Sequence, residues 1–226
     1  MANNFTLTLD TTGPSNPSIS LEGGAVYATA QLISATIGTG DGTTVGYQMK
    51  IWGDVDNSYN ANIQTAEGSS AWITYNTSQA VKLSATDGTK TIYLKIRDDV
   101  YNESAQTSDA ITLNTAVPTV NITGPSVSKI SKISGKNETT FSFTSDAGFD
   151  EYKVKVVSST SSTHDTGVLI GTAGGSTNMS GAAGGYASGT PINSAIRGAD
   201  LETASAGDGS KIVKVFVKTA AGIWSV

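Results

Sequence analysis

Histidine, the usual base of a nucleophilic triad, occurs once in this sequence, and cysteine does not occur. The single histidine, His164, follows the serine- and threonine-rich run 158–163. A triad needs a base beside the nucleophile and a third group that orients the base, whereas a lone histidine in a polar run is typical of a loop. Zinc prefers histidine and cysteine ligands, so a zinc site here would need mostly carboxylates. We therefore expect neither a triad nor a transition-metal site.

Calcium is a better candidate, because it needs only oxygen ligands. Asp54, Asp56 and Ser58 carry side-chain oxygens two residues apart, which is the spacing at the start of an EF-type loop. Such a loop closes with a glutamate at its twelfth position, where this sequence has Thr65. Since aspartate is also an ordinary turn residue, a structural turn is the favoured interpretation and a calcium site the alternative. The same two interpretations apply to the pair Asp98–Asp99.

Four aromatic residues of the first half are candidates for stacking on the apolar face of a sugar. They are Trp52, Tyr59, Trp72 and Tyr75. Large aromatic side chains are also frequent core residues, and Trp72 is followed by Ile73, so core packing is the competing interpretation.

Glycoside hydrolysis needs two carboxyl groups, one of them with a raised pKa in an apolar pocket. Nothing in the sequence around Glu67, Glu103 or Glu138 indicates such a pocket, and solvated surface side chains are the simpler interpretation. We therefore expect no catalytic residues, no enzyme activity and no cofactor.

The charge balance argues against nucleic acid as a partner. The chain has a net charge of −5, and lysine and arginine do not cluster beside aromatic residues. A phosphate backbone is bound mainly by basic surfaces. The chain also lacks a run of about 20 apolar residues, the length that a membrane-spanning helix needs, so we expect no membrane insertion.

The elements that would position these residues are strands. Threonine, serine, glycine, valine and isoleucine are abundant, and short alternating apolar and polar runs are separated by Gly, Asn, Asp and Pro. No segment keeps a helical stripe for more than a turn or two, which predicts an all-β fold. The strand-like runs are 5–9, 18–21, 30–37, 46–52, 71–75, 81–83, 91–97, 110–113, 119–122, 139–144, 151–157, 167–170, 191–196 and 211–218.

Three of these segments recur in the same order about 100 to 120 residues later, which indicates two homologous domains with a boundary near residues 115–118. The last pair begins with Asp-Gly, which supplies the backbone of a tight turn before a long strand. The matched pairs are 9–14 with 113–118, 46–51 with 151–156, and 87–97 with 208–218.

A family resemblance rests on the motifs of the first copy. Tyr-x-Met-Lys-Ile-Trp (47–52), Trp-Ile-Thr-Tyr (72–75), Asp-Gly-Thr-Lys-Thr-Ile-Tyr-Leu-Lys-Ile-Arg-Asp (87–98) and Ile-Thr-Leu-Asn-Thr-x-x-Pro (111–118) resemble the bacterial and phage Ig-like repeats that occur in tandem on virion and cell surfaces. The similarity covers about residues 14–226. It implies two tandem immunoglobulin-like β-sandwich domains.

The expected domain layout follows from the repeat and the resemblance together. Residues 1–13 form an N-terminal strand or arm, residues 14–115 the first Ig-like domain, and residues 116–226 the second. The second domain contains a stretch rich in Gly, Ala and Ser, residues 171–189, which is typical of a long surface loop.

The resemblance, taken with an N-terminus that lacks the charged and apolar regions of a signal peptide, favours a phage virion protein made in the host cytoplasm. We expect a non-enzymatic structural or display module: a capsid decoration protein, a head or tail fibre, or a neck or tail-surface protein. Its expected partners are capsid or tail proteins, with weak adhesion to a host-surface glycan or protein through multiple copies. The alternative is a secreted bacterial carbohydrate-binding or adhesin fragment.

The two copies differ at their ends. The first copy finishes with the strand-like run 110–113, which has no counterpart after residue 218, while Phe5, Leu7 and Leu9 form a similar run before the first copy. This run could add to the open sheet edge of a second copy or to a virion partner. The competing interpretation is an edge strand of its own domain, because local pairings are more common.

Overall fold

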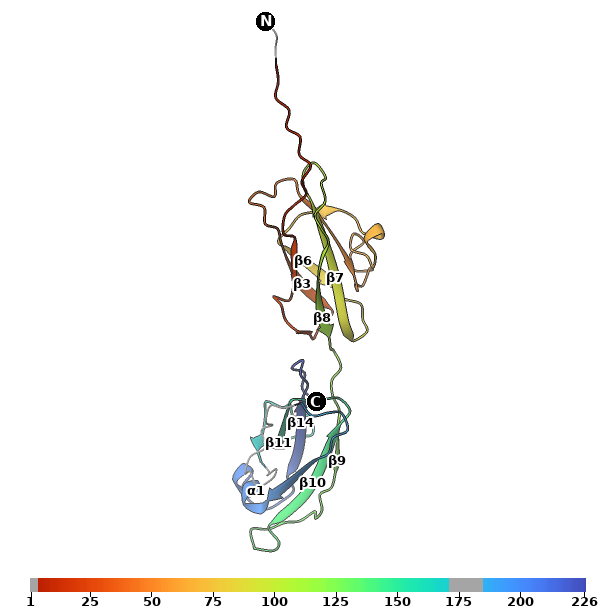
Figure 1. Ribbon diagram of the computed structural model, residues 1–226. Coiled ribbons are helices and arrows are strands. Elements are labelled where there is room, and N and C mark those ends of the chain that lie inside the picture. Colours follow the sequence, from red (N-terminus) through yellow and green to blue (C-terminus); the bar gives the residue numbers. More distant parts are fainter. Residues whose placement is uncertain (1–3, 171–184) are drawn as a thin grey trace. The chain divides into compact units, whose positions relative to one another are not determined.

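The computed structural model describes residues 4–170 and 185–226. These residues divide into two compact units, Met1–Thr115 (unit 1) and Ala116–Val226 (unit 2). Each unit consists of strands in two sheets with one apolar core between them (Figure 1). The predicted all-β, immunoglobulin-like sandwich is confirmed.

Unit 1 pairs a three-stranded sheet, in the order β1-β3-β6, with a five-stranded sheet, in the order β2-β8-β7-β4-β5. All pairings are antiparallel except β2 with β8, which is parallel. The elements are β1 (Ser18–Leu21), β2 (Tyr27–Ala28), β3 (Leu32–Gly38), β4 (Gln48–Gly53), the 3-10 turn η1 (Glu67–Ser69), β5 (Ile73–Thr74), β6 (Ser78–Lys82), β7 (Gly88–Arg97) and β8 (Thr107–Leu113).

Buried and partly exposed residues alternate along β7, and this pattern shows how the sequence forms the sandwich. Ile92, Leu94 and Ile96 are fully buried in the first core, and the residues between them point to the opposite face of the sheet. Successive side chains of a strand point to opposite faces, so one strand supplies both a core wall and a surface row. That surface row carries the candidate site.

Unit 2 has two three-stranded sheets, in the orders β13-β10-β9 and β12-β11-β14. Its core contains several aromatic rings, among them Phe143 and Phe149. The elements are β9 (Val120–Thr123), β10 (Glu138–Ser145), β11 (Glu151–Val157), β12 (Val168–Leu169), β13 (Ile192–Arg197), the helix α1 (Gly198–Ala204) and β14 (Ile212–Lys218).

The predicted strand at Phe5–Leu9 does not form within the described chain. In the structure this segment pairs with no strand of the described chain, and Phe5, Leu7 and Leu9 are 88%, 84% and 85% exposed. A strand needs a neighbour for its backbone N–H and C=O groups, and none is present here. The interpretation as an edge strand of its own domain fails with it.

Three elements, β2, η1 and α1, were not predicted from the sequence. Most of the predicted loop 171–189 lies outside the described residues. Tyr186, near its end, stacks on Phe149 with ring centroids 4.7 Å apart and packs against the second core. Among the described residues, no helix has the length and apolarity of a membrane span.

Candidate functional site

The outer face of the five-stranded sheet of unit 1 carries three pairs of large polar or aromatic side chains. Residues of β4 lie directly opposite residues of β7 across the antiparallel ladder, and opposite residues in such a ladder have side chains in contact range. The pairs are Gln48 with Arg97, Lys50 with Lys95, and Trp52 with Tyr93. We call these six residues, with Trp72 and Tyr101, the aromatic–cationic face.

Arg97 is the centre of this face. Its guanidinium carbon lies 4.4 Å from the ring centroid of Trp72 and 4.4 Å from that of Tyr101. Its Nε donates a hydrogen bond to Gln48 Oε1 at 2.7 Å, and Lys50 Nζ lies 4.7 Å from the Trp72 centroid. A cation over an aromatic face is attracted by the ring quadrupole, so these contacts hold the guanidinium in one orientation.

The turn after β7 presents Tyr101 to Arg97. Tyr101 has a φ of 69°, in the left-handed region that non-glycine residues rarely adopt, and its side chain is 64% exposed. The buried Asp98 carboxylate fixes the turn, because it accepts hydrogen bonds from the backbone N–H of Val100 (3.0 Å) and Asn102 (2.8 Å). A strained residue held by its surroundings is frequent at ligand sites. Asp98 therefore acts here as a turn residue.

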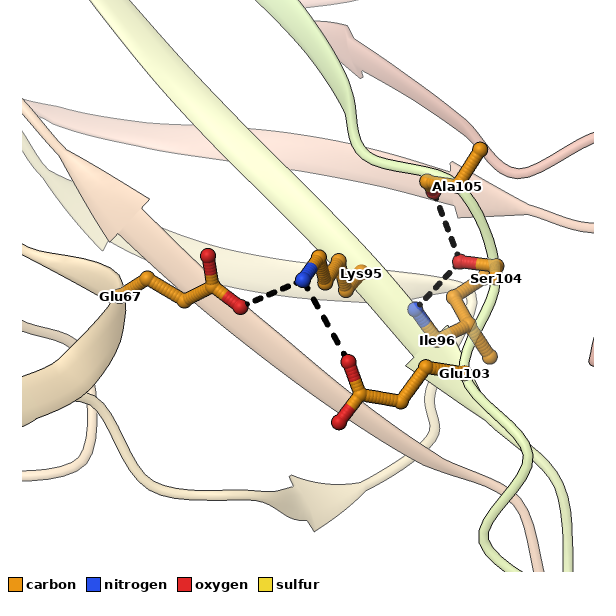
Figure 2. A network of polar contacts seen from close by, with 6 residues as sticks. All are labelled: Glu67, Lys95, Ile96, Glu103, Ser104 and Ala105. Carbon is orange, nitrogen blue, oxygen red and sulfur yellow. Dashed lines mark hydrogen bonds and ion pairs between the residues drawn. The ribbon is translucent and has the colours of Figure 1, made fainter.

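Lys95, which lies opposite the like-charged Lys50, is paired with two carboxylates (Figure 2). Lys95 Nζ lies 2.7 Å from Glu67 Oε1 and 3.4 Å from Glu103 Oε2. The hydrogen bond that Lys95 donates to Glu67 is the main cause of the raised Lys95 pKa, and the hydrogen bond that it donates to Glu103 adds to it. Lys95 therefore remains protonated and joins the 3-10 turn and the β7–β8 connection to the sheet.

The three glutamates considered as catalytic acids are all paired with cations. Glu67 and Glu103 bind Lys95, and Glu138 of unit 2 lies 3.2 Å from Arg197 Nε. Each of these carboxylates is thus the ion-pair partner of a lysine or an arginine in the structure.

The four predicted ligand-binding aromatics do not form one platform. Trp52 is only 6% exposed and stacks on Tyr93 with centroids 5.6 Å apart, while Tyr75 packs against the first core. Tyr59 is 48% exposed in the segment between β4 and η1. Of the four, Trp72 is the one in contact with the cations of the face.

Both candidate calcium ligands make hydrogen bonds within the protein. Asp54 Oδ2 accepts from the backbone N–H of Thr91 at 2.8 Å. Asp56 Oδ1 accepts from the backbone N–H (3.0 Å) and hydroxyl (2.6 Å) of Ser58, and Asp56 Oδ2 lies 2.8 Å from Lys82 Nζ. In the described part of the chain, no three His, Asp or Glu side chains gather closely enough to hold a metal. This bonding pattern is that of a structural turn.

Asp56 makes the stability of unit 1 depend on pH. The hydrogen bond from Lys82, followed by those from Ser58, lowers the Asp56 pKa to about 2 from 3.8. A carboxyl group with a lower pKa in the folded state contributes stability above pH 3.8, and this contribution disappears as the pH falls through 2. We expect Asp56→Asn to lower the unit 1 melting temperature at pH 7 but to match the wild type near pH 2. Calorimetry at the two pH values tests this, and an equal difference at both would contradict it.

Unit 2 repeats the arrangement of a tryptophan between cations. The Trp224 centroid lies 4.3 Å from Lys153 Nζ and 5.4 Å from Lys218 Nζ, and the Trp224 ring stacks on His164 at 4.5 Å. Burial lowers the pKa of His164, so the stacked imidazole is mostly neutral at pH 7. The lone histidine thus packs on an aromatic ring in unit 2.

Sequence reasoning missed Arg97, Lys50, Tyr101 and Trp224 as members of these clusters. A signal was present for the first two, because the alternation of β4 and β7 places Lys50 and Arg97 on the face opposite the core. No comparable signal exists for Tyr101 and Trp224, which reach the cations from turns.

Comparison with known proteins gives similarity in structure without similarity in sequence. No protein-family model matches the chain, and no curated protein matches it. The fibronectin(III)-like modules of CbhA from Clostridium thermocellum align over 92% of this chain and 90% of theirs, with 12% identity and a TM-score of 0.43. The chitinase ChiA74 from Bacillus thuringiensis aligns over 92% of this chain but 30% of its own, with 14% identity and a TM-score of 0.31.

Proposed function

We propose that this protein is a non-catalytic display module that binds acidic sugars weakly through the aromatic–cationic face of unit 1. The observation that carries the proposal is Arg97, held against the faces of Trp72 and Tyr101 at the surface of the sheet. An arginine oriented in advance loses little entropy when it binds a carboxylate through two parallel N–H donors.

The chemistry of the face selects the class of ligand. Tyr101 is 64% exposed and offers apolar ring surface to a sugar, while Arg97 and Lys50 supply positive charge beside it. Stacking alone would accept neutral sugars, and charge alone would accept any anion. Both together favour a sugar that carries a carboxylate or sulfate group.

A single face of this size gives modest affinity, so the module is useful where many copies act together. Multivalent display raises overall binding by about 10²–10⁴-fold without new contacts. We propose a phage virion as the carrier, on the basis of the resemblance to tandem Ig-like repeats of virion surfaces. A secreted bacterial carbohydrate-binding or adhesin fragment is the second candidate, and the same face supports it. Co-sedimentation of the protein with intact phage particles would separate the two.

The binding proposal is tested on an array of neutral, carboxylated and sulfated glycans. We expect the wild type to bind acidic glycans, and Arg97→Lys to lose at least about tenfold in affinity, since lysine cannot bind a carboxylate in bidentate fashion. Arg197→Lys is the matched control, because Arg197 lies in unit 2 beside Glu138 and should leave binding unchanged. Equal binding of neutral and acidic glycans, or full retention by Arg97→Lys, would reject the proposal.

A further inference from the structure

Arg97 and Lys50 carry the uncompensated positive charge of the aromatic–cationic face. Within residues 4–170 and 185–226, no aspartate or glutamate forms an ion pair with either of them. Arg97 Nε donates its hydrogen bond to the neutral side chain of Gln48 at 2.7 Å, and the guanidinium otherwise lies against aromatic rings. The terminal nitrogens of Arg97 are therefore left without a carboxylate of the protein.

Glu103 lies where it could neutralise Arg97. The two residues form an isolated antiparallel bridge, so they lie directly opposite each other. Residues in that arrangement have Cβ atoms about 4.5–5.5 Å apart, and opposite charges at such positions stabilise the pair. Buried Ser104 keeps this segment against β7, because its Oγ accepts from the Ile96 backbone N–H at 3.0 Å and donates to the Ala105 carbonyl oxygen at 2.9 Å (Figure 2). The backbone of Glu103 is therefore fixed beside Arg97.

Lys95 binds the Glu103 carboxylate in place of Arg97. Lys95 Nζ lies 3.4 Å from Glu103 Oε2 and 2.7 Å from Glu67 Oε1, so one ammonium group binds two acidic side chains (Figure 2). Lys95 lies two residues before Arg97 on β7 and therefore on the same face of the sheet, where Glu103 reaches it diagonally. The negative charge of Glu103 is thereby directed to Lys95, and Arg97 stays available for another anion.

The corresponding cation of unit 2 is neutralised within its own domain. Lys218 occupies the position of Arg97 in the repeat, and two residues earlier Phe216 replaces Lys95. Lys218 forms an ion pair with Glu151, which lies opposite it on β11. A cation at this position of the sheet thus binds a carboxylate of its own domain when one is within reach and no lysine competes for it.

We infer that Lys95 is a positioning residue of the aromatic–cationic face: it binds Glu103, so that the guanidinium of Arg97 stays free for the carboxylate or sulfate group of a sugar. The inference rests on the proposed function, because free terminal nitrogens matter only to a site that binds anions. The Lys95 side chain is 23% exposed and its ammonium group is bound by two carboxylates. Lys95 therefore acts through Arg97 and not by contact with the ligand.

Calorimetric titration with a trimer of galacturonic acid tests this inference on the full chain. The proteins compared are the wild type, Lys95→Gln, and two double variants that add Glu103→Gln or Glu67→Gln to Lys95→Gln. We expect Lys95→Gln to bind the trimer about three- to tenfold more weakly, because the released Glu103 carboxylate competes with the ligand for Arg97. Adding Glu103→Gln should restore the affinity to within about twofold of the wild type.

Glu67→Gln is the matched control, because it removes the same charge from a side chain that lies on η1 and not opposite Arg97. In the Lys95→Gln background it should leave the affinity within about twofold of Lys95→Gln alone. Equal rescue by the two glutamate substitutions would mean that only net charge matters. That result, or unchanged binding by Lys95→Gln, would overturn the inference.

A crystal structure of Lys95→Gln gives a readout that does not depend on glycan binding. We expect a carboxylate oxygen of Glu103 within about 4 Å of a terminal nitrogen of Arg97. A structure in which Glu103 makes no contact with Arg97 would overturn the inference even if the wild type binds the trimer. A wild type that binds no acidic glycan would instead reject the proposed function, while the new ion pair in the variant would still support the role of Lys95.

Discussion

Gly53→Ala is expected to destabilise unit 1 by roughly 2–5 kcal/mol, from overpacking and backbone strain together. Gly53 ends β4 with a φ of 135°, and a Cβ atom built on it would lie 2.2 Å from the carbonyl oxygen of Thr91. The obstacle is backbone of the central strand β7, which cannot move without breaking its pairing with β4. Thermal unfolding should show the unit 1 transition lowered by about 10 °C or more.

Gly88→Ala separates steric conflict from backbone strain. Gly88 has a similar φ of 128°, but nothing lies within 4 Å of a Cβ atom built there. We expect this variant to lose only about 1 kcal/mol, the cost of the unfavourable φ. If both variants melted at the same temperature, the close approach of Gly53 to β7 would not be the cause of the loss.

Several strands of this protein could be predicted from the sequence because they have one buried face. The predicted bounds of β1 and β11 agree with the structure at both ends. In β11, Tyr152, Val154 and Val156 alternate with Glu151, Lys153 and Lys155, and only one assignment of faces buries the apolar set. Short-range alternation therefore carries enough information to locate such strands.

Elements that depend on distant contacts could not be predicted in this way. The helix α1 covers only seven residues and begins at Gly198, whose backbone N–H donates to the Asn137 carbonyl oxygen at 2.9 Å. A helix this short is not stable alone, so its existence rests on neighbours far away in the sequence. The strand predicted at Phe5–Leu9 does not form within the described chain for the converse reason, because alternation indicates a preference for pairing but cannot supply the partner.

The candidate site likewise has one part that the sequence predicts and another part that depends on distant contacts. Alternation along β4 and β7 places Lys50 and Arg97 on one face, and this much could be read from the sequence. Trp72 and Tyr101 reach Arg97 only through the conformations of two connections, one of them fixed by the buried Asp98. The sequence gives no signal for such contacts: Trp72 is a candidate only as a large aromatic residue, and nothing singles out Tyr101.

Phe143→Ala is expected to destabilise unit 2 by about 3–5 kcal/mol. Phe143 is 1% exposed, and its ring lies 5.3 Å from that of Tyr152 and 6.4 Å from that of Phe149. Edge-to-face aromatic pairs contribute about 0.5–1.5 kcal/mol beyond their buried area, so truncation removes both a large apolar volume and these contacts. Denaturant unfolding followed by circular dichroism should show a lower midpoint for unit 2.

Two further variants test whether the lost aromatic contacts or the lost side-chain volume accounts for most of the destabilisation by Phe143→Ala. Phe143→Leu keeps most of the volume and should cost about 1–2 kcal/mol, since it loses the ring contacts but leaves a smaller cavity. Ile122→Ala changes the residue opposite Phe143 on β9. Ile122 is 43% exposed, so this variant should change stability by no more than about 0.5 kcal/mol.

Because the two units have separate cores, all three variants should leave the unit 1 transition in place. A shift of that transition by Phe143→Ala would mean that the two cores unfold together.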